Sequence, residues 1–189
     1  MMKLLKTPAQ DVSYAVLGEM RLPDRTPVYL SLLSHCSKAE ICEGFRGLSK
    51  NSRYLRFHSP VRRLTDAQLI HLTDIDSVNR AIVAAHIDEG DHQRGVGLAR
   101  YARLEERSTA EFAVTVLDAY QGKGIGSSLL EHLRHVAFGN GIDILQGFVL
   151  RNNYLMIHIL EGLNASRRLE ADGSLRYDLE TSPPDLLPS

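Results

Sequence analysis

The pattern of apolar and polar positions changes twice along the chain, and each change predicts a different kind of element. Short apolar stretches alternate with polar, turn-forming stretches through the middle of the sequence, which is typical of an antiparallel meander. The predicted strands cover residues 28–33, 80–87, 95–104 and 110–117, with turns at 86–92 and 105–109. Helical spacing before the meander predicts helices at 38–47, at 48–57 with Ser49 or Ser52 as a cap, and from a capping box at Thr65 to about Asp74.

After the meander the apolar period lengthens to that of a helix. Apolar residues at 125, 129, 130, 133, 136 and 137 share one face, and Gly139-Asn-Gly141 ends the helix. A strand at 142–150, a second amphipathic helix to about residue 163 and strand patterns at 167–170 and 175–180 follow. The strand–helix–strand order over 110–149 implies a parallel crossover. We therefore expect an α+β (mixed α/β) fold.

The length of 189 residues fits one domain with short extensions. We expect residues 1–25 to be an N-terminal arm or an extra strand, 26–181 to form the domain, and the proline-rich 182–189 to be a tail. The N-terminus lacks the apolar run of a signal peptide, and no stretch is long enough to cross a membrane. A cytoplasmic location is the expectation.

Charge and composition narrow the kinds of ligand. The formal net charge is −1 and the pI is about 6.7, so no global field favours nucleic acid or an anionic membrane. An anionic ligand must therefore be held by local geometry. Cys36 and Cys42 are expected to be inert thiols, and no metal is expected, because His132 and His135 lie on a polar helix face with no third ligand. His58 is a minor candidate to line an acceptor site.

The segment Gln121-Gly-Lys-Gly-Ile-Gly126 lies between a predicted strand and a predicted helix. Its glycines permit close backbone approach or positive φ, and the helix that follows has free N–H groups and a partial positive charge at its start. This combination favours a phosphate site over a plain turn. The spacing fits neither a Walker loop nor the dinucleotide fingerprint, because Gly122-Lys-Gly is too short and Leu129 stands where the last glycine is needed.

The run from Ala110 to Leu130 resembles the GNAT superfamily of acyl-CoA-dependent N-acyltransferases. The family's Gln/Arg-x-x-Gly-x-Gly/Ala motif matches Gln121 to Gly126, and the resemblance continues through Asn153-Tyr-Leu-Met156 and fades near Ala165. The segments 52–57 and 97–101 also look like the acetyltransferase domain of bacterial protein-lysine acetyltransferases. The resemblance implies a mostly antiparallel twisted sheet with a splayed parallel strand pair and flanking helices.

The resemblance also implies where acetyl-CoA binds, as a co-substrate and without a metal. The pantetheine arm would lie in the gap between the splayed strands, with the pyrophosphate on the glycine loop and Asn153 near the pantetheine. The implied cofactor-binding residues are Val114, Thr115, Val116, Gln121, Gly122, Lys123, Gly124, Ile125, Gly126, Ser127 and Asn153.

Glu111 is the candidate general base. A lysine amine must lose a proton before it attacks, which costs about 4.6 kcal/mol at pH 7. Glu111 lies beside Phe112 and Val114, where a lone carboxylate is costly unless it is used or paired, and it matches the glutamate base of the resembled branch. The alternatives are an exposed carboxylate at a strand edge or a partner for Arg100 or Arg103.

The chain departs from the resembled pattern at two places. Many GNAT enzymes have a tyrosine seven residues after the motif asparagine as a general acid, and here that position is Leu160. The family's Leu-Gly-Phe after this helix is Leu163-Asn-Ala165, in which Asn164 can adopt the left-handed conformation. We therefore expect an N-acetyltransferase that acts by direct attack of an amine, either a protein lysine or a small molecule. A non-catalytic acyl-CoA-binding module is the alternative, and a homodimer stays open.

Overall fold

The computed structural model describes residues 14–106 and 108–183, so most of the predicted N-terminal segment and C-terminal tail lies outside the described residues. The elements in chain order are β1 (Tyr14–Arg21), β2 (Pro27–Leu33), α1 (Lys38–Arg46), α2 (Lys50–Phe57), α3 (Asp66–Thr73), β3 (Arg80–Glu89), β4 (His92–Arg103), β5 (Thr109–Val116), the 3-10 turn η1 (Asp118–Tyr120), α4 (Ile125–Gly139), β6 (Ile144–Val149), α5 (Tyr154–Gly162), β7 (Ser166–Leu169) and β8 (Leu175–Glu180). None of the described helices is long and apolar enough to span a membrane.

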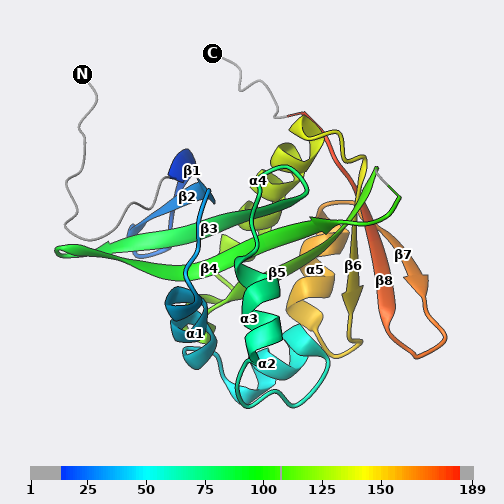
Figure 1. Ribbon diagram of the computed structural model, residues 1–189, viewed down its shortest axis with the longest axis horizontal. Coiled ribbons are helices and arrows are strands. Elements are labelled where there is room, and N and C mark those ends of the chain that lie inside the picture. Colours follow the sequence, from blue (N-terminus) through cyan, green and yellow to red (C-terminus); the bar gives the residue numbers. More distant parts are fainter. Residues whose placement is uncertain (1–13, 107, 184–189) are drawn as a thin grey trace.

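The described strands form one eight-stranded sheet in the order β1-β2-β3-β4-β5-β6-β8-β7. Neighbours pair antiparallel except β5 and β6, which pair parallel because α4 crosses over between them. This confirms the predicted α+β fold with a mostly antiparallel sheet and one parallel pair (Figure 1).

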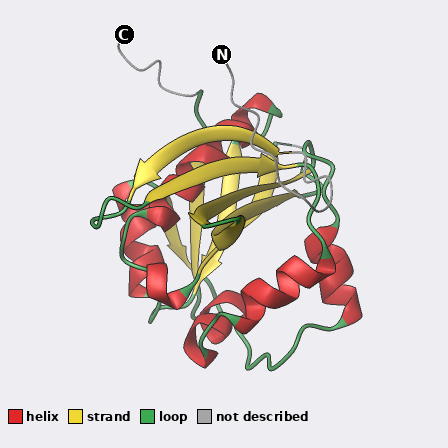
Figure 2. Cartoon of the chain, turned by 90° about the vertical axis from the view of Figure 1, so that its left-hand side faces the viewer, coloured by secondary structure: helices red, strands yellow, loops and turns green. Residues whose placement is uncertain are grey.

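The helices cover both faces of the sheet, which is strongly twisted (Figure 2). On one face α4 and α5 pack against residues such as Ala99, Tyr101 and Phe112 in the main core. On the other face α1 and α3 form a smaller core that includes Leu98. Because Leu98 and Ala99 are consecutive in β4, their side chains point to opposite faces, as strand geometry requires.

Local sequence signals set several helix starts. The predicted capping box at Thr65 is present, since its hydroxyl accepts from the Gln68 N–H at 3.2 Å. Ser49 caps α2 in the same way by accepting from the Ser52 N–H at 3.1 Å. A second capping box, formed by Ser37 and Glu40, starts α1.

The predicted turn at residues 86–92 was too wide. Strand β3 continues to Glu89 and β4 begins at His92, so only Gly90 and Asp91 connect them, with Gly90 at φ 68°. Cross-strand pairing and the ion pair of Glu89 with Arg94, at 3.1 Å, hold these polar residues in the hairpin. Polar composition alone therefore marked the hairpin end as loop.

Residues 14–21 of the predicted N-terminal segment form the edge strand β1, which pairs with β2 and is bulged between Val16 and Gly18. This strand brings Met20 within 3.5 Å of the position of a Cβ on Gly124, at the start of α4. The N-terminal strand therefore lies beside the glycine loop.

Candidate functional site

A gap opens between β5 and β6. Their parallel pairing covers Thr109 to Glu111 on β5 and ends where Glu111 meets Gln146. Beyond this point the strands diverge around a cavity of about 360 Å³. It is lined by the C-terminal end of α2, the middle of β5, the end of β6, the start of α5 and the β7–β8 turn, through Leu55, Arg56, Phe57, His58, Glu111, Phe112, Ala113, Val114, Gly147, Phe148, Val149, Asn153, Met156, Asp172 and Ser174.

The glycine loop lies between the C-terminal end of β5 and helix α4. Gly122 and Gly124 adopt φ of 70° and 86°, a left-handed conformation that side chains with a Cβ rarely adopt. Gly124 is the N-cap of α4, and no side chain of the described residues caps this helix end. The first-turn N–H groups of α4 have no partner within the helix and carry its positive end, so the loop is suited to hold a phosphate.

The side chain of Gln121 points back into the protein. Its Nε2 donates to the carbonyl oxygen of Val116 at 2.9 Å and to Ser52 Oγ at 3.1 Å. Gln121 therefore closes the loop, and the carbonyl oxygen of Val116, a residue that the resemblance implies contacts the cofactor, accepts this hydrogen bond within the protein. This role of the motif glutamine was not predicted from the sequence.

Asp118 ties helix α2 to the same loop. Its carboxylate accepts from the Ser49 N–H and from Ser52 Oγ, each at 2.9 Å. Burial alone would raise the pKa of Asp118, but the hydrogen bonds from Ser49 and Ser52 outweigh it and lower the pKa. The sequence reasoning missed Asp118, because its partners lie 66 and 69 residues away along the chain.

The other predicted cofactor-binding residues lie on β5, in the loop and in the first turn of α4. Val114 lines the cavity, whereas Thr115 is held in the sheet opposite Leu98 of β4. Ile125 is buried in the core, so only its backbone is available to a ligand. Lys123 lies 5.2 Å from the centre of the Tyr120 ring, and Gly126 and Ser127 form the first turn of α4.

Glu111 lines the narrow end of the gap, on the opposite side of β5 from Phe112. Its side chain is exposed, which fits the alternative of an exposed carboxylate at a strand edge, so the argument that a lone carboxylate beside Phe112 and Val114 is costly does not hold. The predicted alternative partner Arg103 is turned elsewhere, because it donates to the carbonyl of Asn140 at 2.6 Å. Glu111 is thus an accessible carboxylate where the two strands begin to separate.

Two arginine side chains, Arg56 and Arg100, interact with the charge of Glu111. Burial, and to a smaller extent the charge of Arg100, lower the pKa of Arg56 to about 10, and Glu111 opposes the shift. Arg100 is 5% exposed and donates to the carbonyl of His71 at 3.2 Å; burial lowers its pKa, and Glu111 again opposes this. Burial and then Arg100 lower the pKa of His71. Glu111 therefore balances charge beside two arginines from separate elements, Arg56 of α2 and Arg100 of β4.

Asn153 starts helix α5 at the edge of the cavity. Its side chain accepts from the Met156 N–H at 3.3 Å, so it acts as the N-cap. Leu160 is fully buried in the core, and Tyr154 is 75% exposed at the helix start, outside the cavity lining. Asn164 adopts φ 58° after the helix, which confirms the expected left-handed conformation.

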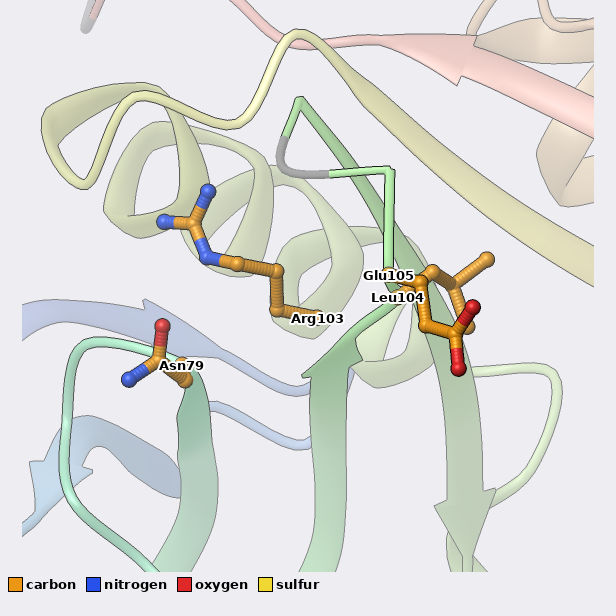
Figure 3. A pocket seen from close by; sticks show the side chains of 4 residues that line it. All are labelled: Asn79, Arg103, Leu104 and Glu105. Carbon is orange, nitrogen blue, oxygen red and sulfur yellow. The ribbon is translucent and has the colours of Figure 1, made fainter.

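A larger cavity of about 570 Å³ lies elsewhere, at the end of β4 and the start of β3, and is lined by Asn79, Arg103, Leu104 and Glu105 (Figure 3). Figure 3 shows that these side chains do not converge on a common point. The carbonyl oxygens of Asn140 and Gly141 already accept from the Arg103 guanidinium. The smaller cavity, which combines a carboxylate with an open strand edge, is therefore the candidate site.

The histidine and cysteine side chains considered from the sequence lie outside this cavity lining, apart from His58. The Nδ1 atom of His132 lies 2.8 Å from the carbonyl oxygen of Ser128, which accepts from the ring, and the ring packs under Gly18 of β1, so His132 is less solvated than expected. No group of three or more potential metal ligands occurs among the residues described. Burial and then the Glu40 carboxylate raise the pKa of the Cys36 thiol to about 12, which keeps it protonated.

The geometry defines a domain with a glycine loop at a helix start beside a splayed parallel strand pair, and comparison with known proteins gives its family. A model of the acetyltransferase (GNAT) family matches residues 51–162, more than half of the chain. The chain therefore belongs to the acetyltransferase (GNAT) family, and the predicted resemblance is confirmed.

Two curated relatives match part of the chain. An acetyltransferase of Pseudomonas aeruginosa is 38% identical over 94 residues, which is 50% of each protein. Acetyltransferase Pat of Mycolicibacterium smegmatis is 33% identical over 141 residues, 74% of this chain and 41% of Pat. The chain thus spans about half the length, or less, of the curated relatives it matches.

Solved structures show the same fold. The GNAT domain of S. lividans PAT has a TM-score of 0.75 and 27% identity and covers 86% of this chain and 96% of that domain. A cAMP-binding acyltransferase from Mycobacterium smegmatis has a TM-score of 0.62 and 25% identity over 94% of this chain and 50% of its own.

Proposed function

We propose that this protein transfers an acetyl group from acetyl-CoA to an amine by direct attack in a ternary complex. The observation that carries this proposal is the open edge of β5, which has the glycine loop at one end and Glu111 at the other. The loop and the first turn of α4 hold the pyrophosphate. The pantetheine arm follows the gap, and the thioester lies near Glu111.

In the reaction, the neutral amine attacks the thioester carbonyl and forms the new C–N bond. The tetrahedral intermediate collapses, the C–S bond breaks, and CoA leaves as the thiolate. Glu111 accepts the proton that the amine nitrogen loses, directly or through a water, and the thiolate takes up a proton to give free CoA. A thiolate is a stable enough leaving group to depart without a dedicated acid, which fits the buried Leu160.

The cationic side chains near Glu111 support this role. Arg56 and Arg100 disfavour an additional positive charge beside them, so they favour the neutral, nucleophilic form of a bound amine. The acceptor is a protein lysine or a small-molecule amine. Similarity to Pat and to the GNAT domain of PAT supports the assignment as an acetyltransferase.

A second candidate function is a module that binds acyl-CoA without catalysis. The observation in its favour is Leu160, which is fully buried where many GNAT enzymes have the acidic tyrosine. This module would share the loop and the gap but not the role of Glu111. Binding of an acyl-CoA is expected of both functions, so only turnover distinguishes them.

Binding is tested first by thermal unfolding with acetyl-CoA. At a hundredfold excess over Kd, binding adds about 2.7 kcal/mol to the free energy of unfolding. The absence of any shift with any acyl-CoA would rule out both candidate functions.

Turnover is tested by release of free thiol with a panel of amines and lysine peptides. We predict that Glu111→Gln lowers kcat by about 10²- to 10⁴-fold while acetyl-CoA binds normally, because only the base is lost. Glu131→Gln, on the exposed face of α4, is the matched control and should act like the wild type. Equal turnover by Glu111→Gln would remove Glu111 as the base, and no turnover over the whole panel would favour the binding module.

A further inference from the structure

The ring of Phe112 closes the narrow end of the gap. A Cβ built on Gly147 of β6 would lie 2.5 Å from both Cε1 and Cζ of Phe112, so the ring rests directly against the β6 backbone. Phe112 is 6% exposed and belongs to the main core, yet it also lines the cavity. This contact lies one residue beyond the last parallel pair, Glu111 with Gln146. Phe112 is thus the side chain at the point where the strands separate, on the face covered by α4 and α5.

A ligand in the gap has a fixed direction. The glycine loop follows the C-terminal end of β5, whereas Phe112 lies near the paired end. From Val116 to Phe112 the strand covers about 13 Å, at about 3.3 Å per residue. A cofactor held by its pyrophosphate at the loop therefore extends toward Phe112, and its acyl group is the part that arrives there.

We infer that Phe112 limits the length of the acyl group, so that the site takes acetyl-CoA and excludes longer straight-chain acyl-CoAs. This inference rests on the proposed function and names the acyl specificity of the same site. Glu111 and Phe112 are consecutive in β5 and face opposite sides of the sheet. The acceptor amine approaches from the Glu111 side, and the acyl chain is directed to the Phe112 side.

The ring has little freedom to make room. It is packed between β5 and β6, and Gly147 is the residue that permits this close approach, since any side chain there would displace the ring. Each methylene beyond acetyl must then be placed against a rigid aromatic wall. Pockets of this kind discriminate about tenfold or more for each methylene.

The test is a calorimetric titration of free CoA, acetyl-CoA, propionyl-CoA and butyryl-CoA into the whole chain and its variants. Phe112→Ala removes the ring, and Phe112→Leu keeps a smaller apolar side chain should the alanine variant fold poorly. Phe138→Ala, at the exposed end of α4 and outside the cavity lining, is the matched control. No acceptor is needed, so the result does not depend on knowing the natural amine.

We expect the wild type and Phe138→Ala to bind butyryl-CoA at least about a hundredfold more weakly than acetyl-CoA, about tenfold for each of its two additional methylenes. In Phe112→Ala this ratio falls below about tenfold while the affinity for free CoA is unchanged, and Phe112→Leu recovers affinity for propionyl-CoA. Equal affinity of the wild type for acetyl-CoA and butyryl-CoA would overturn the inference, as would full discrimination retained in both Phe112 variants. If free CoA and every acyl-CoA fail to bind the wild type, the proposed function itself is wrong.

Discussion

The two edges of β5 differ in how far they are paired with their neighbouring strands. On the β4 side, β5 is paired from Ala110 to Val116, opposite Arg103 to Gly97. On the β6 side the pairing ends at Glu111. One edge therefore holds the strand in the sheet, and the other leaves backbone groups and side chains free to meet a ligand.

This difference shows how a sheet can be both rigid and open. Backbone groups that face an unpaired edge need a partner, and an extended ligand with amide groups can supply one as a further strand would. The loop at the end of the open edge adds an anion site made mostly of backbone, whereas the Glu111 end is made of side chains from several elements. Substitutions can perturb the open edge at three places: the glycine loop, the narrow end at Phe112, and the contact of Asp118 with α2 that supports the loop.

The largest effect is expected at the loop. Gly124→Val places a β-branched residue at φ 86°, at the N-cap of α4, and should raise the Kd for acetyl-CoA by at least about a hundredfold. The matched control is Gly90→Val in the β3–β4 turn, where φ is 68° and a Cβ would have no atom within 4 Å. Both variants should lose stability in denaturant unfolding, but only the first should lose binding in calorimetry. Similar acetyl-CoA affinity in the two variants would contradict the loop assignment.

A smaller effect is expected at the narrow end. Gly147→Ala forces its Cβ against the Phe112 ring, and this overpacking should lower the free energy of unfolding of the protein by about 1–3 kcal/mol. The displaced ring should also lower the affinity for acetyl-CoA more than the affinity for free CoA. The control is Gly162→Ala at the end of α5, where a Cβ meets no atom within 4 Å. Urea unfolding and calorimetry give both quantities, and an unperturbed Gly147→Ala would mean that the ring is mobile.

The smallest effect is expected where Asp118 fixes helix α2 to the loop. Asp118→Ala removes the acceptor for the Ser49 N–H and Ser52 Oγ and should cost about 1 kcal/mol, since the carboxylate is solvent-exposed and its hydrogen bonds are partly screened. The KM for acetyl-CoA should rise a few-fold because α2 is no longer fixed to the loop, with kcat nearly unchanged. Asp91→Ala, in the exposed β3–β4 turn, is the control. A loss confined to kcat would place Asp118 in the chemistry instead.

Much of the fold could be predicted because its signals are local. The strand–helix–strand crossover, the capping box at Thr65 and the left-handed Asn164 follow from short stretches of sequence. The hairpin end near Gly90 was misjudged, since pairing between strands keeps polar residues in register where composition alone favours a loop.

The site was less predictable, because its parts meet only in three dimensions. The sequence predicted Glu111 by family resemblance, but its exposure and its cationic surroundings depend on Arg56 from α2 and Arg100 from β4. The inward turn of Gln121 depends on Ser52, which is 69 residues away. The contact of Phe112 with Gly147 likewise depends on strand register, which no single segment encodes.

Amide hydrogen exchange with saturating acetyl-CoA tests most directly whether the cofactor occupies the open edge of β5. We predict that residues 112–116 and the loop at 122–127 gain protection on binding, while β4, already paired on both sides, changes little. Binding that protects neither segment, or that protects only the residues around Arg103 in the larger cavity, would contradict the placement of the cofactor in this gap.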